Sequence, residues 1–209
     1  MSYAVQALLY TLQGEGARAG RPAVFIRFAG CNLWSGREAD RASAICRFCD
    51  TRFVGEPDAG GGRYATAAEL AGAAAAQWPG GGAPYAVCTG GEPALQLDAD
   101  LIAALHGEGF EVAVETNGTL PLPPGLDWIC VSPKAGTELA VQSGHELKLI
   151  HPQPAGEPER YRGLAFEHRY LQPLEELDGT RHTEETVAYC LANPDWSLSL
   201  QQHKILGIP

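Results

Sequence analysis

Three of the six cysteines stand in one short segment, and their spacing is the first feature of the chain that points to chemistry. Cys31 is separated by fourteen residues from Cys46, and Cys46 by two residues from Cys49. A closed zinc site needs four ligands, usually in two pairs, whereas an iron-sulfur cubane held by three cysteines keeps one iron open to an outside ligand. The spacing therefore favours a [4Fe-4S] cluster, and a zinc site or unconnected core thiols are the alternatives.

The remaining cysteines, Cys88, Cys130 and Cys190, lie inside apolar strand or helix patterns. A free cysteine in such a pattern behaves as a small buried hydrophobe. We expect these three thiols to be inert parts of the core.

Short apolar runs alternate with amphipathic segments, which predicts a mainly parallel sheet with crossover helices. Strands are expected at 23–28, 85–88, 110–114, 128–131, 146–150, 168–171 and 197–200, and helices at 66–78, 98–106 and 183–192. A closed eight-stranded barrel needs about 250 residues. We therefore predict a single α/β domain spanning 1–209, built as an incomplete, laterally open TIM-like barrel of about six mainly parallel strands with few helices.

Polar residues follow five of the expected strands in succession, at 89–93, 115–118, 132–134, 172–173 and 201–203. The carboxyl ends of parallel strands meet at one mouth, where ligands bind. Each strand could also simply leave the core through polar residues, and the Asn-Gly pair in 115–118 is a strong turn signal by itself. The repetition over five strands favours a shared ligand site.

The composition of the chain limits the classes of molecule that it could bind. A formal net charge of -10 argues against nucleic acid, because such binding depends on Lys and Arg at phosphates. No apolar run is long enough to span a membrane, and the absence of a signal-like start predicts a cytoplasmic protein with reduced thiols. An anionic small ligand would then need a few local cations. Arg27, inside the apolar strand "VFIRF", is one candidate, with a solvent-facing edge-strand arginine as the alternative.

The motifs around the cysteines resemble the radical S-adenosylmethionine (SAM) superfamily, whose usual signature is Cys-x3-Cys-x-aromatic-Cys. Its end stands here as "CRFC" at 46–49, its first spacing is stretched, and "GGEP" at 90–93 matches the glycine-rich motif of the superfamily. The closest resemblance is to the 7-carboxy-7-deazaguanine synthase family, a subset of which carries a long insertion between the first two cysteines. The segments that carry it are "LYTLQGEGARAGRPAVFIRFAGCNLWSG", "CDTRFVG", "CTGGEP", "VAVETNGT", "WICVSPKA", "HELKLI", "YLQPLE" and "SLSLQQHKILGIP".

This resemblance implies a carbon-nitrogen lyase that contracts the ring of 6-carboxy-5,6,7,8-tetrahydropterin to 7-carboxy-7-deazaguanine with loss of ammonia, in queuosine and 7-deazapurine biosynthesis. It implies a [4Fe-4S] cluster on Cys31, Cys46 and Cys49, together with SAM and Mg²⁺. For SAM it implies Phe48, Asp50, Gly90, Gly91, Glu92, Glu115, Asn117, Ser132, Pro133, Lys134 and Gln172. For the pterin it implies Leu12, Gln13, Gly14, Arg27, Thr89 and Pro209, and for magnesium Thr51.

The resemblance also implies a homodimer and an electron donor such as flavodoxin or ferredoxin. The insertion, residues 32–45, is expected to form a short helix that shields the cluster or meets the reductant, and no role is assigned to Glu15 or Glu175. Two other interpretations remain. A glycyl-radical activase would share the small barrel and the SAM site but not Gln13, Arg27 or Pro209, and a zinc-stabilised binding module would have no catalytic activity.

Overall fold

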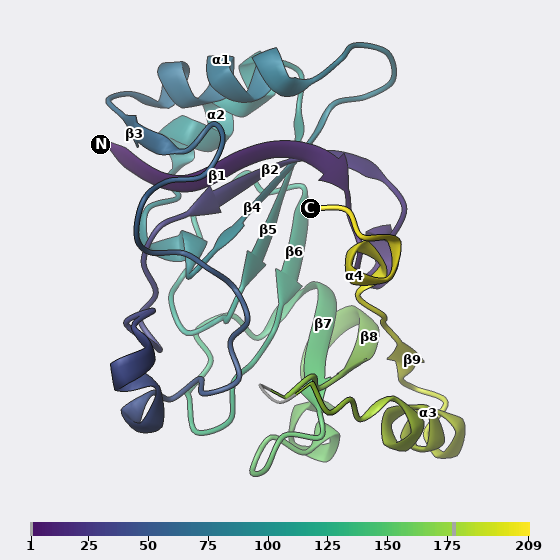
Figure 1. Cartoon of the computed structure of the whole chain (residues 1–209). Coiled ribbons are helices and arrows are strands. Elements are labelled where there is room, and N and C mark those ends of the chain that lie inside the picture. Colours follow the sequence, from purple (N-terminus) through teal and green to yellow (C-terminus); the bar gives the residue numbers. More distant parts are fainter. Residues whose placement is uncertain (1, 177–178) are drawn as a thin grey trace.

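One nine-stranded sheet dominates the computed structural model, which describes residues 2–176 and 179–209 (Figure 1). The strands, in chain order, are β1 (Tyr3–Leu12), β2 (Pro22–Phe28), β3 (Gly62–Tyr64), β4 (Tyr85–Gly90), β5 (Glu111–Thr116), β6 (Trp128–Val131), β7 (Ser143–His151), β8 (Ala165–Pro173) and β9 (Ser197–Leu198). The helices are α1 (Ala67–Gln77), α2 (Ala99–Gly107), α3 (Thr183–Ala192) and α4 (Gln202–Leu206), and short 3-10 helices span Gly16–Arg18, Glu38–Ser43, Pro93–Leu95 and Pro158–Tyr161.

The order of the strands is β3-β1-β2-β4-β5-β6-β7-β8-β9. From β2 to β9 every neighbouring pair is parallel, whereas β1 runs antiparallel to both β2 and β3. The prediction of an open, mainly parallel α/β barrel is confirmed, although the sheet has nine strands and not about six. The sequence pattern missed β1 because its consecutive apolar residues lack a period of two. It also made β9 too long, since only Ser197–Leu198 pairs.

The C-terminal segment runs from the edge strand β9 back to β1, the strand next to the opposite edge of the sheet. After β9 the chain forms α4, which lies beside the end of β1 (Figure 1). The backbone N–H of Gln202 donates to the carbonyl of Gly14 at 2.9 Å, and the Thr11 hydroxyl donates to the carbonyl of Pro209 at 3.0 Å. The C-terminus is thereby held against the loop that follows β1.

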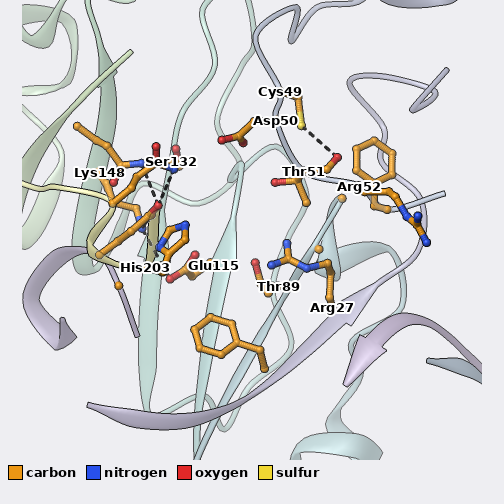
Figure 2. Close-up of a pocket in the computed structure, with 18 of the residues that line it drawn as sticks. Arg27, Cys49, Asp50, Thr51, Arg52, Thr89, Glu115, Ser132, Lys148 and His203 are labelled. Atoms are coloured by element: carbon orange, nitrogen blue, oxygen red, sulfur yellow. Dashed lines mark hydrogen bonds and ion pairs between the residues drawn. The ribbon is translucent and has the colours of Figure 1, made fainter. Parts of the chain in front are cut away.

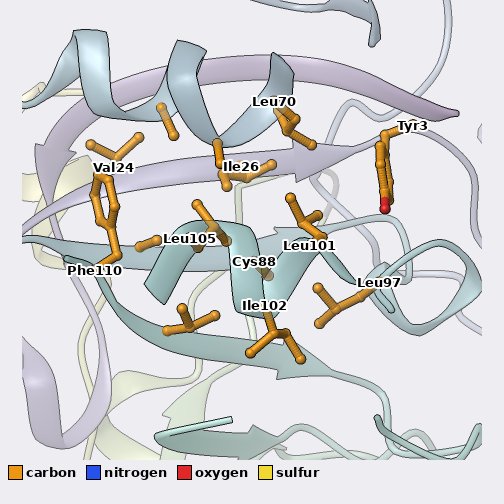
Figure 3. Packing of buried hydrophobic residues seen from close by; sticks show 14 of the residues in the cluster. Tyr3, Val24, Ile26, Leu70, Cys88, Leu97, Leu101, Ile102, Leu105 and Phe110 are labelled. Carbon is orange, nitrogen blue, oxygen red and sulfur yellow. The ribbon is translucent and has the colours of Figure 1, made fainter. Parts of the chain in front are cut away.

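The largest apolar cluster lies between the sheet and the helices α1 and α2 (Figure 3). Leu70 of α1 and Leu101 and Leu105 of α2 are fully buried against the strands. Each such leucine contributes about 1.5–3 kcal/mol on burial. The Asp98 side chain caps the start of α2 by accepting a hydrogen bond from the N–H of Leu101 at 2.9 Å. Because α1 and α2 pack on one face of the sheet, its other face is left for the site.

Two of the three predicted core thiols are buried, those of Cys88 and Cys130. The prediction is wrong for Cys190, which is only partly buried. It lies on α3, whose neighbouring Leu191 is 80% exposed, because this helix packs on the sheet with only part of its surface.

No helix in the described ranges is long and apolar enough to cross a lipid bilayer.

Candidate active site

A cavity of about 720 Å³ opens at the carboxyl ends of the parallel strands (Figure 2). Side chains from the loop after β1, from the cysteine segment and from the ends of β4, β5, β6 and β8 line it. Every site residue expected from the sequence lines this cavity except Glu92 and Pro133. The polar strand ends therefore converge on one mouth, as parallel topology requires.

The three cysteines of the sequence motif all line this cavity. A hydrogen bond between the Cys46 and Cys49 side chains lowers the pKa of Cys49 to about 6 and raises that of Cys46. Burial raises the pKa of Cys31. Trp34 and Phe53 form the apolar backing of these thiols, with their rings edge to face at 5.6 Å.

This arrangement suits a cubane better than a single ion. In residues 2–176 and 179–209, no group of three or more His, Cys, Asp or Glu side chains is placed to hold one metal ion, which leaves a zinc site without a ligand set. A [4Fe-4S] cluster spreads its cysteines over different irons. Three thiols on one wall of an open cavity fit that requirement, and the cavity provides room for an outside ligand at the fourth iron.

The insertion contains the expected short helix, the 3-10 helix Glu38–Ser43. Arg41 on this helix donates to the carbonyls of Arg47 at 2.8 Å and Cys49 at 3.0 Å. Its guanidinium also lies over the Trp34 ring, 4.1 Å from the centroid. The insertion thus fastens the backbone of the Cys46–Cys49 pair, whereas contact with a reductant stays a prediction.

Two glycines at the end of β4, its last residue Gly90 and the following Gly91, are required by the close approach of chain segments. Gly90 has φ +131°, and a Cβ there would lie 2.3 Å from the carbonyl oxygen of Phe28. A Cβ on Gly91 would lie 2.0 Å from the carbonyl oxygen of Gly30 and 3.0 Å from the Cβ of Cys31. The glycines therefore let the strand end meet the backbone that carries the first cysteine.

Replacing Gly91 with alanine is expected to lower the free energy of unfolding by about 1–3 kcal/mol, because the new methyl group must displace backbone. It is also expected to reduce iron content, since the displaced segment carries Cys31. Anaerobic thermal unfolding and iron analysis measure both effects. Gly72→Ala is the matched control, because Gly72 is exposed on α1 and no atom lies near the added methyl group. This variant should be slightly more stable than the wild type, since alanine has a higher helix propensity than glycine. Equal iron content in both variants would contradict the role of Gly91.

Glu92 is not among the residues that line the cavity, and its expected contact with SAM stays a prediction. Its carboxylate is fully buried and accepts from the Thr116 hydroxyl at 2.6 Å and from the N–H groups of Asn117 at 2.8 Å and Ala94 at 2.9 Å. Burial raises its pKa. By accepting these three hydrogen bonds, the Glu92 carboxylate holds in place the end of β5, and Asn117, which follows β5, lines the cavity.

Pro133 is likewise buried away from the cavity, while its neighbours Ser132 and Lys134 line it. The Lys134 ammonium donates to the carbonyl of Ser132 at 2.6 Å and to its hydroxyl at 2.7 Å. Burial lowers the pKa of Lys134, and the nearby thiols of Cys46 and Cys49 oppose that shift. The expected contact of Pro133 with SAM stays a prediction.

The Asn-Gly segment at 117–118 could be a simple turn or part of a ligand site, and Asn117 has features of both. Its side-chain oxygen accepts from the N–H of Thr119 at 2.9 Å, which is turn chemistry. Its amide also donates to Asn32 of the insertion at 2.9 Å, and Asn117 lines the cavity. The segment is a turn that also presents a polar group to the site.

Sequence reasoning missed several charged residues of the cavity. Lys148 comes from the middle of β7, His203 and Lys204 from α4, and Glu15, which was left without a role, from the loop after β1. Lys204 donates to Asp50 and to Glu175, both at 2.6 Å, and so connects α4 with the cysteine segment and with the loop after β8. Unlike Arg27, which stands alone in an apolar run, these residues lie in polar or mixed sequence, so no local pattern marked them as part of a site.

Two further expected residues face each other across a strand pair. Arg27 of β2 is in register with Thr89 of β4, and both line the cavity (Figure 2). Arg27 is half-buried, and its guanidinium makes no hydrogen bond or ion pair within the described part of the chain. A cation in this setting is suited to an anionic ligand.

Thr51 lines the cavity two residues after Cys49. Its hydroxyl could supply only one of the six oxygens that magnesium requires, so a magnesium ion there would need oxygens from the substrate or from water.

Comparison with known proteins agrees with this geometry. Residues 40–172 match the model of the Radical SAM superfamily. The chain is 60% identical to the 7-carboxy-7-deazaguanine synthase of Bordetella pertussis and 59% identical to that of Bradyrhizobium diazoefficiens, in each case over 100% of both chains. The crystal structure of QueE from Escherichia coli superposes with a TM-score of 0.69 at 27% identity, covering 97% of this chain and 95% of that one. The chain therefore belongs to the radical SAM superfamily and, within it, to the 7-carboxy-7-deazaguanine synthase family.

Proposed function

We propose that this chain converts 6-carboxy-5,6,7,8-tetrahydropterin to 7-carboxy-7-deazaguanine, as a carbon-nitrogen lyase of queuosine and 7-deazapurine biosynthesis. One observation carries the proposal: the same cavity is lined by three cluster-type thiols, by Pro209 and by Arg27, which has no ion pair among the described residues. Full-length identity of 60% to a synthase of that name supports it.

Membership of the superfamily implies a [4Fe-4S] cluster and SAM as cofactors. When bound, they supply a 5'-deoxyadenosyl radical, and the protein supplies orientation and the exclusion of water. Cys31, Cys46 and Cys49 would hold the cluster. Polar groups at the strand ends would hold SAM, namely Asn117, Ser132, Lys134, Glu115 and Gln172, beside Phe48 and Asp50.

The pterin would lie on the opposite side of the cavity, where Arg27 and Thr89 stand side by side (Figure 2). Arg27 is proposed to bind the carboxylate with its planar fork, and Gln13 and Gly14 to bind the ring edge. In the proposed reaction the pterin gives up a hydrogen atom from C6 and its ring contracts. The hydrogen atom is then returned to the substrate, so that SAM is regenerated, and ammonia is eliminated. By holding the carboxylate, Arg27 fixes which carbon faces the radical source.

Magnesium is proposed to bind together with the pterin, with Thr51 as its protein ligand. Because one hydroxyl is a weak site by itself, affinity for the ion should depend on the substrate. Measuring Mn²⁺ binding by electron paramagnetic resonance (EPR), with and without the carboxypterin, tests this.

The remaining expectations are a cytoplasmic homodimer that is reduced by a flavodoxin or ferredoxin. The exposed apolar residues Leu191, Ile205 and Leu206 near the C-terminus support a subunit contact. Light scattering of the purified protein measures the oligomeric state.

The function is tested by anaerobic reconstitution followed by incubation with SAM, Mg²⁺, a reductant and the carboxypterin. Mass spectrometry should detect the deazaguanine product, with SAM recovered unchanged after turnover. A colourless protein that holds zinc would support the binding-module interpretation. An intact cluster that gives no product would instead favour the activase interpretation.

A chain that stops at Ile208 is expected to lose roughly ten- to a hundredfold in kcat/KM for the pterin, the range for one hydrogen bond to a charged group. Pro209 lines the cavity and accepts a hydrogen bond from Thr11, so its removal opens that wall. Steady-state kinetics measure the change. Leu200→Ala is the control, because Leu200 is exposed shortly before α4 and does not line the cavity. Unchanged kinetics after truncation would remove Pro209 from the site.

A further inference from the structure

Lys148 occupies a position where a lysine is rare. It lies in the middle of β7, and its side chain is only 5% exposed. Along this strand Glu146, Lys148 and Ile150 alternate with Leu147 and Leu149, which are packed in the apolar core. Period-two alternation sends Lys148 to the face of the sheet that lines the cavity. A buried ammonium is retained at high cost unless it is paired, so its partners indicate its role.

Two carboxylates pair with this ammonium. The Lys148 Nζ lies 2.6 Å from Oε2 of Glu15 and 3.7 Å from Oε1 of Glu115 (Figure 2). Burial lowers the pKa of Lys148, but the charges of Glu115 and Glu15 outweigh it and raise that pKa well above its ordinary value. In return, burial raises the pKa of Glu15, and the Lys148 ammonium overrides this and lowers it to about 2. The lysine is charged and keeps Glu15 ionised.

Gln13 closes these contacts into a ring. Its amide donates to Oε1 of Glu115 at 2.8 Å, and its side-chain oxygen accepts from the backbone N–H of Glu15 at 3.1 Å. We call Gln13, Glu15, Glu115 and Lys148 the lysine ring. Outside the ring, Oε1 of Glu15 also accepts from Gln172 at 3.0 Å. The ring therefore joins the loop after β1 to the ends of β5 and β8 through β7.

The lysine ring spans both ligand regions of the proposed function, on which this inference rests. Gln13 belongs to the pterin side and Glu115 to the SAM side. Glu115 lies beside Lys148 directly, and Gln13 is linked to Lys148 through its hydrogen bonds with Glu15 and Glu115. A ligand that reorients one carboxylate must change the pairing of the other, because both compete for the same ammonium. We propose that Lys148 is a positioning residue that couples the binding of SAM to the binding of the pterin.

The coupling is measured as the ratio of the SAM dissociation constants without and with the carboxypterin, by anaerobic calorimetry on cluster-loaded protein. In the wild type we expect the pterin to tighten SAM binding by about tenfold, within the usual range of coupling between two sites. In Lys148→Met the ratio is expected to fall toward one. Because Lys148→Met leaves two carboxylates facing each other, the double variant Lys148→Met/Glu15→Gln removes one of these charges and is tested beside it.

Three controls separate positioning from general damage. Melting temperature and iron content show whether each variant is folded and loaded, and Lys148→Arg, which keeps the charge, is expected to keep most of the coupling. Arg63→Met removes an exposed cation of β3 that bonds Ser2 and should leave the ratio unchanged. The SAM-induced change in the EPR spectrum of the reduced cluster reports SAM binding independently of catalysis.

Each outcome decides the proposal. Independent binding of the two ligands in the wild type overturns it, as does a wild-type ratio in whichever methionine variant is folded. Loss of the ratio in a folded, loaded methionine variant, with Arg63→Met unchanged, supports it. If the wild type binds SAM but no carboxypterin, the proposed function itself fails, which is a distinct result.

Discussion

Alanine at any one of Cys31, Cys46 or Cys49 is expected to abolish product formation and to leave the purified protein with little iron. The reason is that three thiols are the protein's whole contribution to a cubane that already has one open corner, so losing a second attachment leaves the cluster weakly held. The three thiols line one cavity wall, and the match to the superfamily model includes Cys46 and Cys49 but begins after Cys31. Cys31 is therefore the decisive position.

Iron and sulfide analysis, together with the EPR spectrum after reduction, measure this result. Cys190→Ala is the matched control, since Cys190 is a partly exposed thiol on α3 that lies outside the cavity. It should keep both iron and activity. Full iron content in Cys31→Ala would mean that the first ligand lies elsewhere, and it would undermine the alignment of the stretched motif with the superfamily signature.

The location of the site was predictable because it depends on topology more than on detail. Once strands and helices alternate, parallel order follows, and residues just after each strand must meet at one edge. That argument placed Thr89, Ser132 and Gln172 correctly at the cavity from positions far apart in the chain. The individual roles of these residues stay predictions.

What the sequence could not reveal depends on contacts between distant segments. Glu92 belongs to a conspicuous motif, yet its carboxylate is used by Thr116 and Asn117 in the fold, and no local pattern distinguishes that from a ligand contact. Lys148 is a single charge in a strand, and its role becomes visible only through its partners Glu15, which lies 133 positions away, and Glu115. The return of α4 to the start of the chain is likewise a tertiary fact.

Two cations of the cavity, the buried Lys148 and the half-buried Arg27, differ in their partners. Lys148 and Arg27 both come from strands, but Lys148 has two carboxylate partners, whereas Arg27 has none within the described residues. A paired cation is held for structure and positioning, and its loss leaves partners unsatisfied. An unpaired, half-buried cation lowers stability in the free protein and is compensated only when an anion binds.

Arg27→Met is therefore expected to keep or raise the free energy of unfolding of the free protein, while lowering kcat/KM for the carboxypterin by roughly ten- to a hundredfold. The affinity for SAM should be unchanged, because Arg27 lies with Thr89 on the side of the cavity assigned to the pterin. The kcat/KM of Arg27→Lys should fall between those of the wild type and Arg27→Met, since a single ammonium cannot form the two parallel hydrogen bonds of a guanidinium to a carboxylate.

Melting temperatures with and without the pterin, together with steady-state kinetics, separate the two possible roles of this arginine. A ligand-binding Arg27 predicts that the pterin raises the melting temperature of the wild type and not that of Arg27→Met, because only binding to the folded state stabilises it. An arginine that serves the fold predicts the reverse pattern, a lower melting temperature with an unchanged KM. Partial misfolding of Arg27→Met would lower its melting temperature, whereas loss of a ligand contact lowers kcat/KM and leaves the melting temperature of the free protein unchanged or higher. The two measurements together therefore test the contact between Arg27 and the pterin carboxylate.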